Sequence, residues 1–254
     1  MKKNNNIVIL HTLKNQLELL KLPYILENFE EITNKSATEK TSHLEFLAKL
    51  IEGESIFKQK RTTDRKIKQA KFPVFKTLDE YDFTFPKKIN ESQIKHFFHL
   101  NFVSQKANII FIGGVGLGKT HLAIALAYQA CLKEYSVLFT SAIDIINALS
   151  AAKTLGRLQF ELNKYLRPQL LVIDELGYLP IDQLGADLLF QVFSKRYEKG
   201  SIILTTNKAF KKWPSIFNND STITSAVLDR LLHHAETSVI QGPSYRMKDQ
   251  NPDY

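Results

Sequence analysis

One segment, Gly113–Thr120, constrains this chain more than any other feature, because it fits the phosphate-loop pattern of Gly, any four residues, Gly, Lys and then Ser or Thr. Glycines let the backbone bend where a side chain would clash, so several N–H groups can point inward at phosphate oxygens. Lys119 brings a positive charge to the phosphates, and the Thr120 hydroxyl can ligate Mg²⁺. The residues expected to contact the nucleotide are Gly113, Gly114, Val115, Gly116, Leu117, Gly118, Lys119, Thr120 and His121.

The residues on either side of this segment supply the context that a phosphate loop requires. Residues 108–112 form a short apolar run that is typical of a buried parallel strand. Residues 121–128 are rich in Ala and Leu, which favour a helix. The order strand, glycine loop, helix places phosphates at the N-terminal end of a helix dipole. A Gly-rich turn that matches by chance is the alternative, and these flanks count against it.

Short apolar runs alternate with helical patterns along the rest of the chain. Four more strands are predicted, at residues 136–140, 170–173, 201–205 and 237–240. Buried strands that alternate with helices indicate an α/β fold with a parallel five-stranded sheet flanked by helices. In such a sheet, ligands bind at the carboxyl ends of the strands, where the phosphate loop also lies.

Polar side chains follow two of these strands. Asp174 and Glu175 end the third strand, and Asn207 follows the fourth. Asp174 is placed to hold Mg²⁺, directly or through water, while Glu175 is the better candidate for polarising an attacking water and Asn207 could orient that water. Acidic loop residues, or an Asn that begins a turn, would explain the same sequence without any chemistry. The phosphate loop upstream favours a hydrolytic site.

The N-terminal part has a different pattern, which predicts a small all-helical domain. Leucines recur at helical spacing within residues 7–70, and Pro23 separates two short helices. Ser42 and Glu45 form a capping box for a long helix, in which Gly53 is a weak point. We therefore expect a helical domain at residues 1–71, a connector at 72–106 that is partly helical over 91–98, and a nucleotide-binding domain at 107–254.

The long helix carries a basic segment, on a chain whose formal net charge is +8. Four of its cations recur at steps of three, four and three, which places them on one helical face, and three more widen that face. The set is Lys58, Lys60, Arg61, Arg65, Lys66, Lys68 and Lys71. A solvated helix face is the alternative, but like charges repel at this spacing, and the net charge favours the phosphates of duplex DNA. We can assign no side chain to base edges, so we expect binding that is largely independent of sequence.

Other sequence features limit where the protein can be located, and two arginines have no role that spacing alone can assign. No apolar run is long enough to cross a bilayer and no signal-peptide core follows the basic N-terminus, so we expect a cytoplasmic protein without a membrane partner. Cys131 is the only cysteine, which excludes an intramolecular disulfide. Arg230 and Arg246 could each approach a transferred phosphoryl group, on which negative charge spreads, but spacing alone places neither.

Several runs resemble the IstB-like ATP-binding proteins, the helper ATPases of insertion-sequence transposition. These belong to the AAA+ class and are related to the DnaC and DnaI helicase loaders. The resemblance spans about Leu13 to Lys248 and rests on residues 20–23, 70–73, 114–123, 174–180, 206–207, 228–234 and 244–246. The nucleotide motifs are shared by many ATPases, whereas residues 177–180, residues 232–234 and the helical N-terminal part are more specific to this family.

The resemblance implies what the residues alone leave open. It implies an AAA+ P-loop domain without a C-terminal lid, and hydrolysis of ATP with Mg²⁺, for which Lys119, Glu175 and Asn207 are the catalytic candidates already described. Arg230 falls on the arginine finger, which would act on the ATP of a neighbouring copy. Arg246 falls on the second sensor arginine, which acts within its own site. The implied partners are duplex DNA, a transposase and further copies of the chain.

Four functions remain open at this stage. The leading hypothesis is an ATPase that assembles on target DNA with ATP and recruits or activates a transposase. A replicative helicase loader would share the core chemistry and differ in its partner, although the N-terminal helices look IstB-like. A small-molecule kinase would need an acceptor pocket and a mobile lid, which no segment supplies. A binding module that uses ATP only to hold its structure together would bind the nucleotide without turnover.

Overall fold

The computed structural model describes residues 2–248, with side chains from residue 7 onward. The chain divides into two compact units, Met1–Asp64 and Arg65–Tyr254. This division falls inside a helix, whereas the sequence placed the junction at residues 71 and 72, where that helix ends. Sequence patterns mark the end of a helix, but they do not mark the point along it where packing passes from one core to another. The outermost ends of the expected domains, at residue 1 and residues 249–254, lie outside the described residues.

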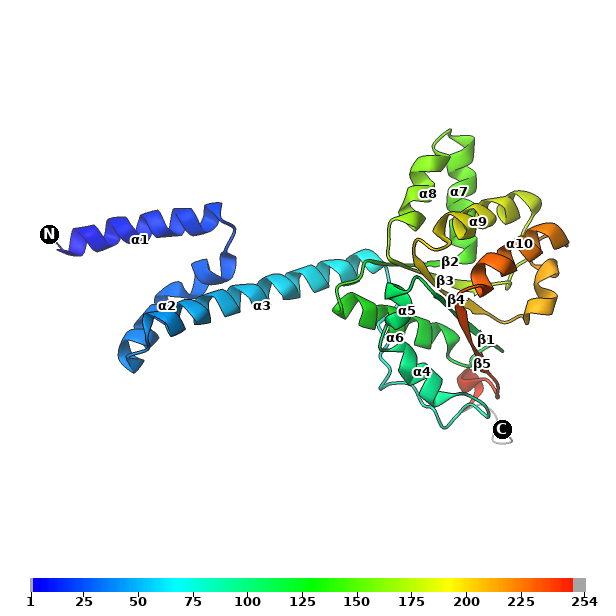
Figure 1. Ribbon diagram of the computed structural model, residues 1–254, viewed down its shortest axis with the longest axis horizontal. Coiled ribbons are helices and arrows are strands. Elements are labelled where there is room, and N and C mark those ends of the chain that lie inside the picture. Colours follow the sequence, from blue (N-terminus) through cyan, green and yellow to red (C-terminus); the bar gives the residue numbers. More distant parts are fainter. Residues whose placement is uncertain (1, 249–254) are drawn as a thin grey trace. The chain divides into compact units, whose positions relative to one another are not determined.

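Three helices make up the first unit: α1 (Lys2–Leu19), α2 (Pro23–Glu39) and the first part of α3 (His43–Ala70) (Figure 1). Pro23 occupies the first turn of α2, where its missing N–H has no intrahelical partner to lose. Leu17, Ile25, Phe29 and Leu50 form a small apolar core between the helices. The predicted separation of helices at Pro23 is confirmed.

The start of α3 has the capping box that the sequence predicts, but the helix is not interrupted at Gly53. The Ser42 N–H donates to Glu45 Oε2 at 3.0 Å, and the Glu45 N–H donates to Ser42 Oγ at 3.3 Å, so the predicted capping box is confirmed. Gly53, predicted as a weak point, lies within a continuous helix. A Cβ atom there would lie 2.0 Å from the Tyr24 ring, so glycine lets α2 and α3 approach closely.

The second unit is built on a parallel five-stranded sheet with the strand order β2-β3-β4-β1-β5. Its strands are β1 (Asn108–Gly113), β2 (Val137–Ser141), β3 (Leu170–Leu176), β4 (Ser201–Thr206) and β5 (Ala235–Ile240). All five lie where the sequence predicted strands, although β3 continues past Ile173 to Leu176. The predicted α/β class with a parallel sheet is confirmed.

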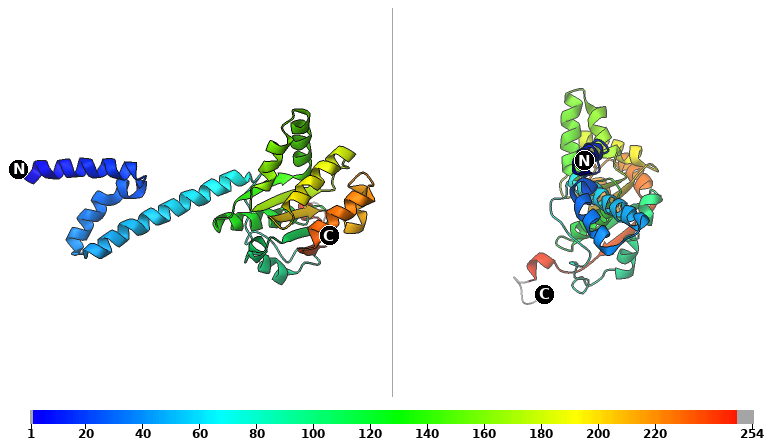
Figure 2. Two further views of the ribbon diagram at one scale, coloured as in Figure 1. Left: turned by 45° about the horizontal axis from the view of Figure 1, so that its top comes forward. Right: turned by 90° about the vertical axis from the view of Figure 1, so that its left-hand side faces the viewer.

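Helices cover both faces of this sheet (Figures 1 and 2). One face carries α7 (Ala142–Thr154), α8 (Leu158–Leu166), α9 (Gln183–Arg196) and α10 (Ser221–Leu232), and the other carries α4 (Glu91–Phe97), α5 (Asn101–Ser104) and α6 (Lys119–Leu132). Neighbouring strand residues pack into opposite layers, as Ile110 does on one side of β1 and Ile109 and Phe111 on the other. Because both faces are buried, the strands have continuous apolar runs rather than alternating ones.

The connector and the C-terminal segment meet beside the sheet. The Lys88 N–H donates to Gln241 O at 3.0 Å, and the Gln241 N–H donates back to Lys88 O at 2.9 Å. Two short 3₁₀ helices are also described, η1 (Phe210–Ser215) and η2 (Tyr245–Met247), and η2 is the one helical element after β5 among the described residues. Within the described part of the chain, the helices are too short or too polar to cross a membrane.

Candidate nucleotide site

Two glycines give the phosphate loop its path from β1 into α6. Gly116 and Gly118 have φ values of 74° and 79°, in the left-handed region that favours glycine. A Cβ on Gly118 would lie 2.5 Å from the Tyr81 ring, and one on Gly116 would lie 2.0 Å from the Ser244 hydroxyl. The loop is therefore closely wrapped by residues from both the connector and the C-terminal segment.

The Thr120 hydroxyl lies directly against the Asp174 carboxylate. Thr120 Oγ1 is 3.0 Å from each of the two carboxylate oxygens, although the residues come from α6 and β3. A hydroxyl oxygen next to a carboxylate is an oxygen ligand set of the kind that Mg²⁺ prefers. The donor atoms present therefore fit a magnesium ion, as the sequence predicted for this pair.

Lys119 lies beside this pair and is almost fully buried, with 4% of its surface exposed. Its Nζ donates to Gly114 O at 2.6 Å and lies 3.5 Å from the Tyr178 hydroxyl. Burial lowers the pKa of the Lys119 ammonium, while the Asp174 and Glu175 carboxylates act in the opposite direction. A buried cation with so few partners is well placed to meet the negative charge of a phosphate.

A β-bulge sets the position of Glu175. The register of β3 on β4 shifts between Ile173 and Leu176, so that Asp174 and Glu175 stand opposite one residue of β4, Thr205. Glu175 has a φ of 61°, in the left-handed region that residues with a side chain adopt uncommonly. Asp174 is buried, whereas Glu175 is exposed and lines the same cavity as Lys119.

Hydroxyl groups at the end of β4 hold this bulge. The Thr205 hydroxyl accepts the Glu175 N–H at 3.0 Å and donates to Asp174 Oδ1, and its side chain is 1% exposed. The Thr206 hydroxyl donates to Leu176 O at 2.7 Å. Sequence reasoning assigned a role to Asn207 and none to the threonines. The available signal was two hydroxyl residues ending a buried strand next to the strand that carries the carboxylates.

The site opens into a cavity of about 560 Å³, which is within the usual size of small-molecule sites. Its walls come from the phosphate loop, from β3, from the C-terminal segment and from the connector. The connector residues are Val74, Lys76, Glu80, Tyr81, Asp82, Phe85 and Pro86. The sequence prediction did not place any connector residue at the site, although a segment rich in aromatic residues is unusual for a linker.

Tyr81 and His121 fasten the connector to the loop. The Tyr81 hydroxyl donates to Leu117 O at 3.0 Å, and the His121 Nε2–H donates to Thr77 O at 2.8 Å. The two rings pack edge to face at a centroid separation of 5.4 Å. Burial raises the pKa of the Tyr81 hydroxyl to about 12, with a smaller effect of Asp82 in the same direction, and burial lowers the pKa of His121. Both side chains therefore favour their neutral forms.

The other predicted site residues fall in different places. Arg246 lines the cavity with Lys119 and Glu175. Asn207 is exposed immediately after β4 and is not among the described residues that line the cavity. Arg230 does not line it either: its Nη1 donates to Ala226 O at 2.9 Å, and its guanidinium lies 5.1 Å from the centroid of the Phe190 ring.

The basic residues expected to meet DNA lie on α3 or directly after it. All are exposed except Lys66, which is half-buried. Arg61 also packs over the Phe57 ring, 5.8 Å from its centroid. Lys58 Nζ also lies 4.0 Å from Glu54 Oε1.

The fold and the site together place the protein in the class of AAA+ P-loop proteins. The fold of the chain resembles that of the DnaC helicase loader, with a TM-score of 0.53 and 24% identity over 65% of this chain and 96% of the other. It also resembles AMPPCP-bound DnaA from Aquifex aeolicus, with a TM-score of 0.55 and 24% identity over 70% of this chain and 53% of the other. At these identities the similarity shows the fold alone.

Sequence comparison identifies the family within that class. The chain belongs to the IstB-like ATP-binding proteins, whose family model matches residues 15–252. A relative from Geobacillus stearothermophilus, named for ATP binding and for insertion sequence IS5376, is 40% identical over 91% of this chain and 92% of its own length. Another from Pseudomonas aeruginosa, named for insertion sequence IS21, is 38% identical over 95% of this chain and 91% of its own.

Proposed function

We propose that this protein is an ATPase that assembles with ATP on duplex DNA and recruits or activates a transposase for insertion-sequence transposition. The observation that carries the nucleotide chemistry is the Thr120 hydroxyl at 3.0 Å from both oxygens of Asp174, beside the buried Lys119. The insertion-sequence relatives support a role in transposition, because they match the helical N-terminal part as well as the sheet. The similarity to the DnaC helicase loader covers only 65% of the chain.

The chain's own groups can perform hydrolysis in a simple order. ATP with Mg²⁺ would supply the phosphoryl group, whose charge spreads as it is transferred. Thr120 and Asp174 would hold the metal, and Lys119 would meet the phosphate oxygens. The bulge places Glu175 at the cavity, where its carboxylate would polarise the attacking water and accept a proton from it. Arg246 reaches the same cavity and would balance the developing charge within its own chain.

Arg230 supports the view that the site is completed by a second copy. Its side chain is held by Ala226 O and Phe190 and does not line its own chain's cavity among the described residues. An arginine supplied by a neighbour would join ATP binding to assembly. We expect Arg230→Ala to bind ATP with unchanged affinity and to lose most of its hydrolysis, measured as phosphate release on duplex DNA. Hydrolysis at the rate of the unmodified protein would show that Arg230 has no such role.

DNA binding through the basic residues of α3 predicts a strong dependence on salt. If about six phosphates are neutralised, the logarithm of the affinity should fall against the logarithm of salt concentration with a slope near −5. Fluorescence anisotropy with unrelated duplexes measures this slope, and it should vary little with sequence. An affinity that does not change with salt would contradict the assignment.

Electron microscopy of the protein with ATP and duplex DNA tests assembly. Adding a transposase or a replicative helicase in turn distinguishes the two candidate partners.

A further inference from the structure

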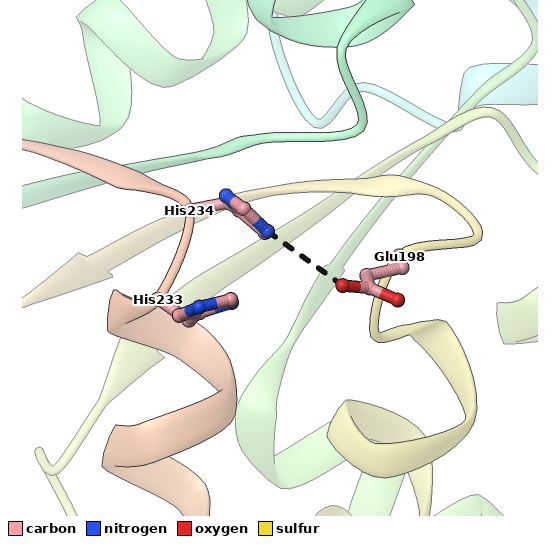
Figure 3. Close-up of side chains that lie close together, drawn as sticks. All are labelled: Glu198, His233 and His234. Atoms are coloured by element: carbon pink, nitrogen blue, oxygen red, sulfur yellow. Dashed lines mark ion pairs between the residues drawn. The ribbon is translucent and has the colours of Figure 1, made fainter.

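A group of three potential metal ligands lies outside the nucleotide site. Glu198 follows α9, His233 follows α10, and His234 precedes β5. One ligand atom from each lies within 4.8 Å of the others, and all three side chains are exposed. Figure 3 shows the Glu198 and His234 side chains directed toward each other, with the His233 ring alongside. We call this group the Glu198–His233–His234 cluster.

The spacing inside the cluster suits a small metal ion. His234 Nε2 lies 3.7 Å from Glu198 Oε1. Two ligands that each lie about 2.0–2.1 Å from a tetrahedral zinc ion are about 3.4 Å apart, so a shift of a few tenths of an ångström would let both ligands bind one ion. The two imidazole rings are also close, with centroids 4.1 Å apart. Two imidazoles and one carboxylate form a common zinc ligand set that leaves a fourth position for water.

The imidazole of His233 is held by a hydrogen bond at one of its two ring nitrogens. Its Nδ1 is hydrogen-bonded to the Tyr197 hydroxyl at 2.8 Å. The Tyr197 oxygen can accept from Nδ1–H, which orients the ring and leaves Nε2 as the nitrogen that binds an ion. Tyr197 comes from the same turn as Glu198, so one short segment supplies both a ligand and the group that orients another ligand.

The backbone that carries the cluster is firmly anchored. Arg196 is 1% exposed and donates to the carbonyls of Tyr165, Pro168, Gln169 and Ser201 at 2.7–3.2 Å. The N–H groups of Lys199 and Gly200 close the turn by donating to Arg196 O, with Glu198 at a φ of 57°. On the other side, the Asn108 N–H donates to His234 O at 2.7 Å. Ligands on anchored elements need little reorganisation to bind a metal.

We propose that Glu198, His233 and His234 bind a divalent transition-metal ion of the zinc type, with Tyr197 as the residue that orients His233. The ion links the turn after α9 and the start of β5 to the end of α10. Arg230 lies in the last turn of α10, and it lines one small cavity together with Glu198 and His234. A bound ion would therefore fix the end of the helix that carries Arg230. Neither this site nor its test depends on ATP hydrolysis.

The test is a metal titration of the untagged, full-length protein after treatment with a chelator. Co²⁺ added without nucleotide should give the intense visible absorption of a tetrahedral ion at one equivalent per chain, and Zn²⁺ should displace it. His234→Ala and Glu198→Gln should each weaken Co²⁺ binding at least tenfold. Tyr197→Phe, which removes only the oriented hydroxyl, should weaken it by about tenfold.

A second pair of histidines provides the matched control. His96 and His99 lie close together on and just after α4, with ring centroids 5.8 Å apart, and no carboxylate completes a metal-ligand group with them among the described residues. His96→Ala should therefore bind Co²⁺ as the unmodified protein does. Zn²⁺ should raise the Tm of the unmodified protein and of His96→Ala, and it should leave the Tm of His234→Ala unchanged. Absence of tetrahedral Co²⁺ absorption in the unmodified protein, or equal binding by a folded His234→Ala, would overturn the proposal.

Discussion

The phosphate loop and the bulged end of β3 lie at the same edge of the sheet, but different interactions set their geometry. The loop follows its path because Gly116 and Gly118 can adopt left-handed φ values. Glu175 adopts a similar φ of 61° although it has a side chain, and the neighbouring strand holds it there through Thr205. The conformation of the loop is thus local, whereas the conformation of the bulge depends on a partner thirty residues further along the chain.

In the proposed function, this difference separates the groups that would bind the nucleotide from the group that would act in its hydrolysis. The loop and Lys119, which lie outside the bulge, would bind the phosphates, and Thr120 would hold the metal together with Asp174 of the bulge. The bulge determines where the Glu175 carboxylate lies relative to that bound group. Changes in the loop should therefore act on nucleotide affinity, and changes in the bulge should act on the rate of hydrolysis at saturating nucleotide.

The largest expected effect comes from Glu175→Gln. The substitution keeps the shape of the side chain and removes the base that would accept a proton from water, so hydrolysis should fall by a factor of roughly 10²–10⁴. Affinity for ATP, measured by equilibrium binding with a fluorescent analogue, should stay within about twofold, because the loop is unchanged. The variant should also remain assembled on DNA in ATP. Rapid turnover by this variant would contradict the role assigned to Glu175.

A smaller effect is expected from removing the hydroxyl that holds the bulge. Thr205→Val keeps the volume of a side chain that is 1% exposed, but it removes the acceptor of the Glu175 N–H and leaves the Asp174 carboxylate with the Thr120 hydroxyl alone among the described residues. We expect the rate at saturating ATP to fall roughly 10–100-fold, as for outer-shell groups in other sites. Thr205→Ser retains the hydroxyl and should restore most of the rate. Equal rates for the valine and serine variants, at matched Tm, would show that the hydroxyl does not position Glu175.

The sequence predicted the loop and all five strands, and it assigned Thr120 and Asp174 to a magnesium ion, because each depends on a local pattern or on the geometry of parallel strands. It did not predict the bulge, since a two-against-one register depends on which residue of β4 lies opposite Asp174 and Glu175. It also treated the connector as a spacer. Tyr81 reaches Leu117 through a contact between segments 36 residues apart, which no periodicity reveals.

The smallest expected effects come from glycines in the phosphate loop, and they differ between two positions of the loop. Gly118→Ala places a side chain at a φ of 79° and 2.5 Å from the Tyr81 ring, so about 1–2 kcal/mol of strain should weaken ATP binding by roughly five- to thirtyfold. Gly114→Ala is the matched control, because its Cβ would meet only Leu117 Cδ1 at 3.6 Å, an ordinary contact. We expect its affinity, measured by isothermal titration calorimetry, to stay within about twofold. A loss of affinity at Gly114 as large as that at Gly118 would show that the backbone around Gly114 must change shape when the nucleotide binds.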